Sequence, residues 1–206
     1  MKSKDFGLTP LEIKIFEKLN TPVKIQDFIH KIPINFEKKG ETLLSPREVL
    51  RQKKAHCMEG ALFAASVFWY HGELPMILDL RTIRPDFDHV VAIFKRNGYF
   101  GAISKSNHGV LLYRDPIYKT IRELVFSYFH EYFLQNGKKT LRNYSKPFDL
   151  RKFGTTWITS NQDLWHIDKA LDKSPHIDLL NAKLIATLRP ADRIQIQAGN
   201  LEIFKK

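Results

Sequence analysis

The sequence predicts a single α+β domain, and three observations lead to this class. Helix signals dominate residues 9–71, strand signals follow over 74–106, and helix signals return after residue 120. Two of the strands are joined by Asn97-Gly98, a two-residue turn typical of an antiparallel hairpin. Helices that precede and follow an antiparallel sheet, without alternating with parallel strands, indicate the α+β class. The 206 residues favour one domain over the whole chain.

Residues 9–52 read as a helical lead-in of three short helices. Thr9, Thr21 and Ser45 each stand directly before a proline, which pairs a side-chain cap with the residue preferred at the first helical position. At the third start, Glu48 completes a capping box. We therefore expect helices from each of these caps, the third giving way just before the central part of the chain.

Residues 53–107 form the expected core. The segment 57–71 contains one charged residue, Glu59, and apolar residues cover all sides of the expected helix, so it should be buried. Gly72 ends it. Strands are expected over 74–80, 87–95 and 99–106, the last two forming the hairpin.

Residues 108–206 are expected to add helices and a closing hairpin. Thr120 opens an amphipathic helix to about residue 134, and a later helix begins after Ser160. The segment 194–203 alternates in polarity around Gly199-Asn200 and predicts a final hairpin.

Composition limits the classes of function. The single cysteine excludes an internal disulfide framework and a multi-thiolate zinc site. The sequence also lacks a zincin-type histidine pair and a phosphate-binding glycine motif, so we expect no metal and no cofactor. The first residues lack the apolar region of a signal peptide, and no run reaches the roughly 18–20 apolar residues of a membrane span, so we expect a cytoplasmic protein without membrane contact. The net charge of +11 leaves open a nucleic acid or an anionic surface as partner, with residues 138–152 as the densest basic run. That run lacks the aromatic interleaving of a base-stacking platform, so the sequence favours a solvated basic surface.

The one cysteine, Cys57, lies where a helix is expected to begin. The dipole and the unpaired N–H groups of a helix start favour the thiolate and can stabilise an oxyanion. The alternative is a buried structural thiol. A catalytic thiolate needs a proton partner, and the candidates are His56, His89 and His108. Because His56 is a sequence neighbour at the helix start, we expect it to point elsewhere, whereas His89 opens a strand.

The hairpin gives His89 predictable neighbours. If Asn97 and Gly98 are the loop, His89 lies opposite Ser106, with Ser104 and His108 diagonal on the same face. Asn107 would share that face only after a bulge. The strand beside His89 therefore offers hydroxyl groups where a third catalytic residue would lie.

This order of features resembles a known superfamily. Cys57 at the start of a small-residue helix, His71-Gly72-Glu73-Leu74-Pro75 before a strand, and Asp88-His89-Val90-Val91 before a hairpin are similar to the core of the transglutaminase-like superfamily of papain-like cysteine enzymes. The similarity covers residues 45–107, and the helical lead-in is also of the kind that such domains carry before the cysteine.

The resemblance implies that Cys57 is the nucleophile and His89 the general base. The family's third residue is an acid, usually aspartate, on the strand after the histidine, whereas Ser104 stands at that place here. Asn107 is the alternative, since an asparagine orients the histidine in papain-like enzymes generally. Gln52, shortly before the cysteine, is an oxyanion candidate by the same resemblance, its alternative being a solvent-facing helix residue.

These inferences predict a cysteine-dependent acyl-transfer enzyme, with amide or peptide hydrolysis through Cys57 and His89 favoured over transfer to an amine. Its partner would be a peptide or protein substrate. Two alternatives stay open: a catalytically inactive binding module on the same fold, indicated by the missing acid, and a basic protein that binds nucleic acid or an anionic surface. The sequence leaves the oligomeric state unknown.

Overall fold

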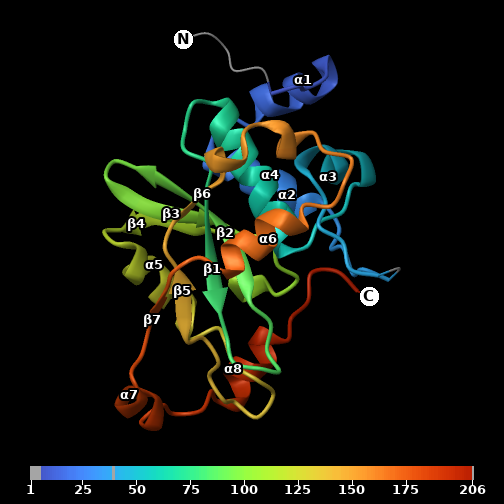
Figure 1. The fold of residues 1–206 in the computed structure, drawn as a ribbon. Helices are drawn as coiled ribbons and strands as arrows, with labels where there is room; N and C mark the ends of the chain where they lie inside the picture. The colour runs from blue at the N-terminus through green and yellow to red at the C-terminus, as the bar shows by residue number, and fades with distance from the viewer. Residues whose placement is uncertain (1–5, 39, 206) are drawn as a thin grey trace.

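The computed structural model describes residues 6–38 and 40–205, and over these residues the chain is α+β. Eight α-helices and seven strands are found in this part of the chain, and all the strand pairs are antiparallel. Figure 1 shows the N-terminal helices gathered at one end of the sheet and the last two helices at the other. None of the described helices is long and apolar enough to cross a membrane.

The three lead-in helices begin at the expected caps. They are α1 (Pro10–Lys18), α2 (Pro22–Lys31) and α3 (Pro46–Gln52). The hydroxyl groups of Thr9, Thr21 and Ser45 accept hydrogen bonds from backbone N–H groups three residues on, at 3.3, 3.2 and 3.2 Å. Each cap satisfies one of the donors that a helix start leaves unpaired, so these local signals fix the helix starts.

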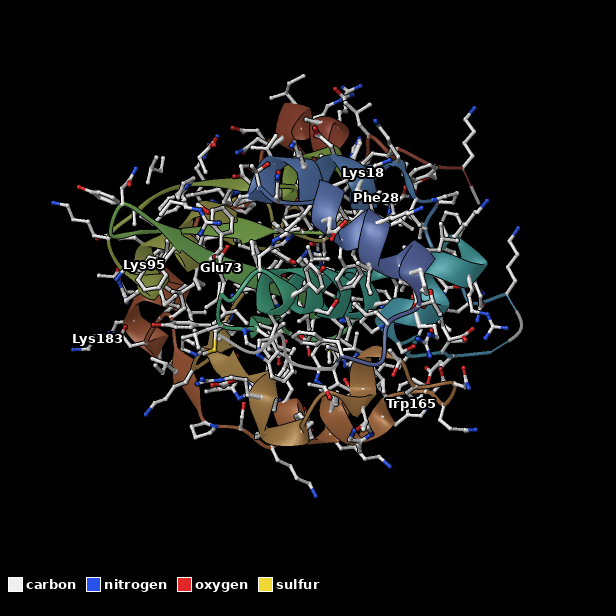
Figure 2. The ribbon with its side chains drawn as sticks, turned by 90° about the horizontal axis from the view of Figure 1, so that it is seen from above. Lys18, Phe28, Glu73, Lys95, Trp165 and Lys183 are labelled. Atoms are coloured by element: carbon white, nitrogen blue, oxygen red, sulfur yellow. The ribbon has the colours of Figure 1, made fainter. Side chains whose placement is uncertain are left out.

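Helix α4 (Cys57–Tyr70) is the buried centre of the fold. All its residues from Met58 to Trp69 are buried, as the apolar residues on all its sides predict. It contacts β2 extensively, and α2 and α3 also pack on it, while α6 (Trp165–Asp172) contributes to the same core. Figure 2 shows α4 enclosed between the N-terminal helices and the C-terminal segment that carries Trp165.

A seven-stranded sheet supports this helix. Its strands are β1 (Met76–Arg81), β2 (His89–Arg96), β3 (Tyr99–Ile103), β4 (Arg114–Tyr118), β5 (Asn143–Ser145), β6 (Phe148–Asp149) and β7 (His176–Asp178). The order is β4-β3-β2-β1-β5-β7, with β6 also paired to β1.

The hairpin between β2 and β3 has the expected register. Arg96 pairs with Tyr99, and Ala92 pairs with Ile103. Asn97 and Gly98 have φ of 52° and 87°, the left-handed values that a tight hairpin turn of this kind requires. The register places the start of β2 beside the residues that follow β3.

The two faces of the sheet face different cores. Val90, Ala92 and Phe94 point to the core that contains α4, whereas Val91 and Ile93 point to a second core with α5 (Ile121–Phe129). This alternation is the period of two expected of a strand that is buried on both faces.

The C-terminal expectations need correction. Helix α5 ends at Phe129 and not near residue 134, and the later helix begins at Trp165. The closing hairpin over 194–203 is wrong, since that segment contains α8 (Arg193–Gly199), and a short helix α7 (Ala182–Ala186) precedes it.

A capping box explains the difference at α8. The side chains of Asp192 and Gln195 each accept a hydrogen bond from the other residue's backbone N–H. This local signal starts a helix, and over so few residues an alternating pattern does not distinguish a strand from one helical turn.

Candidate active site

Cys57 is the first residue of α4 and is partly buried. The N–H groups of the first helical turn have no intrahelical acceptor, so the sulfur lies beside the positive end of the helix. A cavity of about 410 Å³ opens in front of it. Residues from the loop 37–43, the connection 84–88 and helix α6 line this cavity together with Cys57.

His89 begins β2 and is buried, with 6% of its surface exposed. Its Nε2 lies 2.7 Å from the Oγ of Ser104, the expected diagonal neighbour. The Ser104 hydroxyl donates its only proton to the carbonyl oxygen of Leu111, at 2.5 Å. Since this hydroxyl can then only accept from the ring, Nε2 carries a proton, and while the ring is neutral the lone pair of His89 lies on Nδ1. This is the tautomer a general base for Cys57 requires.

His56, the N-cap of α4, also interacts with the thiol, and the expectation that it points elsewhere is wrong. Its Nε2 lies 2.9 Å from the carbonyl oxygen of Thr42, which can only accept, so this nitrogen carries a proton. Burial alone would lower the pKa of His56. Hydrogen bonding to Cys57 and the negative charges of Cys57 and Glu59 outweigh burial and raise it to about 9.

The two imidazoles set the ionisation of the cysteine. Burial alone would raise the pKa of Cys57, but hydrogen bonds from His56 and His89 and the charges of both rings hold it well below its ordinary value. The arrangement therefore favours a thiolate, the nucleophilic form of cysteine.

Glu59 positions the start of α4. It is fully buried and accepts hydrogen bonds from the N–H of His56 at 2.8 Å, the N–H of Leu44 at 2.9 Å and the hydroxyl of Thr42 at 2.9 Å. The same carboxylate thus fixes both the backbone of His56 and the loop whose carbonyl holds the His56 ring. The sequence marks Glu59 as the single charge on a buried helix, which is the signal by which this role could have been found.

Gln26, from α2, positions Ser104. Its Nε2 donates to the Ser104 carbonyl oxygen at 2.9 Å, and its Oε1 accepts from the Ser104 N–H at 3.0 Å. Both residues are buried, so this pair of bonds holds the strand end beside His89 in place. No sequence signal connects residues so far apart.

The other two predicted site residues have different partners. The side chain of Asn107 exchanges hydrogen bonds with the backbone of Phe204, donating at 3.0 Å and accepting at 2.8 Å, and so holds the C-terminal segment. Gln52 is exposed and donates to Glu48 at 3.1 Å, on its own helix. The structure therefore brings Cys57, His89 and Ser104 together, with His56 added.

Tyr132 is a further polar group near the site. Its side chain is buried, and its hydroxyl has no hydrogen-bond partner within residues 6–38 and 40–205. Burial raises its pKa well above the ordinary value, and the charge of Cys57 adds to this effect.

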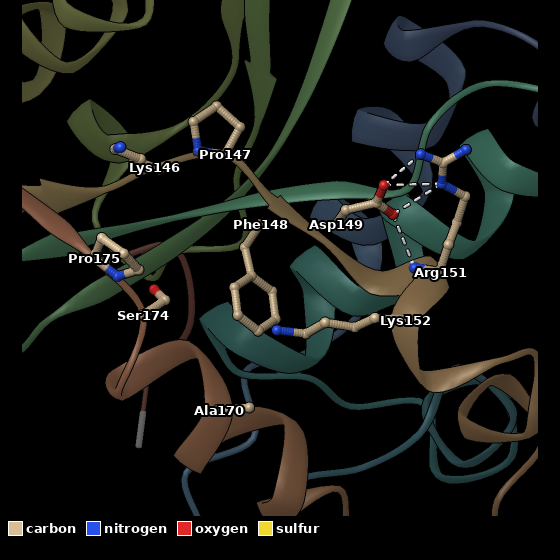
Figure 3. A pocket seen from close by; sticks show the side chains of 9 residues that line it. All are labelled: Lys146, Pro147, Phe148, Asp149, Arg151, Lys152, Ala170, Ser174 and Pro175. Carbon is tan, nitrogen blue, oxygen red and sulfur yellow. Dashed lines mark hydrogen bonds and ion pairs between the residues drawn. The ribbon is translucent and has the colours of Figure 1, made fainter.

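The basic run 138–152 is divided among separate environments. Lys139 is buried, with its Nζ 3.1 Å from Nδ1 of His130. Residues of the run also line a pocket of about 630 Å³, where the ammonium group of Lys152 lies 3.5 Å from the centre of the Phe148 ring. In this pocket Arg151 donates to Asp149 (Figure 3). Part of the run's charge is therefore engaged by its own neighbours.

No family model matches this chain, and no curated protein sequence matches it. Among the described residues, no group of three or more histidine, cysteine, aspartate or glutamate side chains has the arrangement of a metal site.

Proposed function

We propose that the protein is a cysteine-dependent acyl-transfer enzyme of the transglutaminase-like type, and that it hydrolyses amide or peptide bonds. The observation that carries this proposal is the interaction of the Cys57 thiol with His89, whose tautomer is set by Ser104. The resemblance of residues 45–107 to the papain-like core supports the same chemistry.

In the proposed reaction the thiolate of Cys57 attacks the carbonyl carbon, and a carbon–sulfur bond forms. The oxyanion develops beside the N–H groups at the start of α4. The Nδ1 of His89 holds the proton that it took from the Cys57 thiol, and gives it to the leaving amine as the carbon–nitrogen bond breaks, which leaves a thioester on Cys57. Water then attacks the thioester, passes a proton to His89, and releases the acid and the thiolate.

The third residue distinguishes this site from the family pattern. A carboxylate stabilises the imidazolium by charge and fixes its tautomer, whereas the Ser104 hydroxyl fixes the tautomer and supplies no charge. His56 supplies a second imidazolium beside the thiolate. We therefore propose that His56 replaces part of the electrostatic contribution that the missing acid would make.

Acyl-enzyme formation tests the proposal without knowledge of the natural substrate. Mixing the protein with p-nitrophenyl acetate should release p-nitrophenolate in a burst of one equivalent, and intact mass should show one acetyl group. The acetyl group should be absent from Cys57→Ala and strongly reduced in His89→Ala. A folded wild-type protein that forms no acetyl-enzyme would contradict the enzyme and favour the inactive binding module.

A further inference from the structure

The cavity in front of Cys57 has a charge opposite to that of the chain. The protein carries a net charge of +11, yet six carboxylates line this cavity, against Arg84, the imidazole of His56 and no lysine. The carboxylates belong to Glu37, Glu41, Asp79, Asp88, Asp168 and Asp172. If the charged residues were distributed evenly over the surface, basic side chains would outnumber acidic ones in this cavity as they do in the whole chain.

Two of the six carboxylates are compensated. Asp79 is buried and lies 3.1 Å from both Arg81 and His176, and Asp172 lies 2.5 Å from Arg81. These contacts join β1, β7 and α6 and give the two groups a structural role.

The other four carboxylates have no basic partner among the contacts of the described residues. Glu37 accepts from the backbone N–H of Thr42 at 2.8 Å, and Asp88 accepts from the N–H of Thr82 at 2.8 Å. Burial raises the pKa of Asp168, and the charges of Asp172, Cys57 and Glu41 add to this effect, whereas His56 lowers it. Asp168 and Glu41 line the same cavity as Cys57, so both can act on a group bound there.

Aromatic side chains complete the cavity. Phe87 and Trp165 line it, with 77% and 36% of their surfaces exposed. Exposed rings beside carboxylates suit a ligand with an apolar stem and a cationic end, because rings attract cations by their faces and carboxylates by charge.

We propose, on the basis of the proposed function, that the substrate bound beside Cys57 carries a positively charged amine or guanidine group. Cys57 and His89 define the site of reaction, and the carboxylates select the charge of the substrate that binds there. Two sources share this chemistry: a basic side chain on the acyl donor, and a protonated diamine that accepts the acyl group.

Thiol-reactive probes of opposite charge test this inference without turnover. The cationic probe is 2-(trimethylammonio)ethyl methanethiosulfonate, and the anionic one is its 2-sulfonatoethyl analogue. In each reaction the thiolate attacks the sulfenyl sulfur, a disulfide forms, and methanesulfinate leaves. Because the imidazoles beside Cys57 favour anions, a preference for the cation must come from the carboxylates.

We expect the cationic probe to react at least about tenfold faster at low salt, after each rate is divided by that of a small free thiol. The ratio should fall towards one at high salt and in the double variant Glu41→Gln/Asp168→Asn. Glu17→Gln, an exposed carboxylate change on α1, is the matched control and should leave the ratio unchanged. A ratio of one or less in the wild type, or the same ratio in the double variant, would overturn the proposal.

Two further experiments with substrates distinguish whether the positive charge belongs to the acyl donor or to the acyl acceptor. Faster acylation by p-nitrophenyl 6-aminohexanoate than by p-nitrophenyl hexanoate assigns the charge to the donor, and saturable deacylation of the acetyl-enzyme by 1,5-diaminopentane assigns it to the acceptor. If neither charge accelerates its step, the inference is contradicted even where acylation itself supports the proposed function. If no acyl-enzyme forms, the probe ratio still decides the charge of the cavity.

Discussion

At the start of α4 one sulfur atom interacts with two imidazole rings, and each ring has a proton fixed on its far nitrogen. The Nε2 proton of His56 is donated to the carbonyl of Thr42, and the Nε2 proton of His89 is donated to the hydroxyl of Ser104. Neither contact touches the sulfur, yet together they direct both Nδ1 atoms to the region of Cys57. The acceptor at the His89 ring is neutral, whereas Nε2 of His56 also lies 3.4 Å from a carboxylate oxygen of Glu59.

Ser104→Ala should weaken the site without removing it. The variant loses the hydrogen bonds of the Ser104 hydroxyl with His89 and with the Leu111 carbonyl. The bond with His89 acts on the reaction, and its loss, about 0.5–1.5 kcal/mol, should slow acylation of Cys57 by about two- to tenfold. The pH at which the thiolate forms should rise, because the imidazolium of His89 loses its acceptor. The measurement is the acylation rate by p-nitrophenyl acetate across pH.

Ser106→Ala is the matched control for this change. Ser106 is also buried and follows the same strand, but its hydroxyl accepts from the backbone N–H of His108 and not from His89. Its acylation rate should equal that of the wild type. Equal rates in both serine variants would show that Ser104 does not orient His89.

At the scale of elements, α4 packs so closely on the end of β3 that one position admits no side chain. A Cβ on Gly60 would collide with the Cβ of Lys105, whose own side chain is buried and donates to the carbonyl oxygen of Ile32. Gly60 therefore sets the distance between the helix that carries Cys57 and the segment that carries Ser104.

Gly60→Ala should lower the free energy of unfolding by about 1–3 kcal/mol, since overpacking forces the two elements apart. Chemical denaturation followed by circular dichroism measures this. Gly109→Ala is the matched control, because nothing lies within 4 Å of the added Cβ and φ is not positive there, so it should stay within about 0.5 kcal/mol of the wild type. A Gly60 variant as stable as the control would contradict the close packing.

At the scale of the whole molecule, features set by motifs of adjacent residues could be predicted from the sequence. Features set by contacts between segments far apart in the sequence could not. The caps at Thr9, Thr21 and Ser45 and the turn at Asn97-Gly98 are written in adjacent residues, so the lead-in helices and the hairpin were predicted correctly. The hairpin register alone placed Ser104 beside His89.

The features that sequence reasoning missed depend on contacts between distant segments. The ring of His56 is oriented by a carbonyl of the loop 37–43, and two of the cavity's carboxylates, those of Asp168 and Asp172, come from α6, far along the chain. Neither segment carries a motif that connects it to Cys57. The acidic character of the cavity could not be predicted either, because the net charge of +11 does not show where the carboxylates gather in the fold.

The central claim is that the fold makes Cys57 a thiolate with His89 as its partner, and one measurement tests it most directly. Cys57 is the only cysteine, so the rate of alkylation by neutral iodoacetamide reports this site alone. We expect the wild-type rate to stay high at pH values well below the ordinary cysteine pKa of about 8.5, and His89→Ala to slow it and move its rise to higher pH. A wild-type profile that rises near pH 8.5, as in the denatured chain, or one that His89→Ala leaves unchanged, would contradict the account.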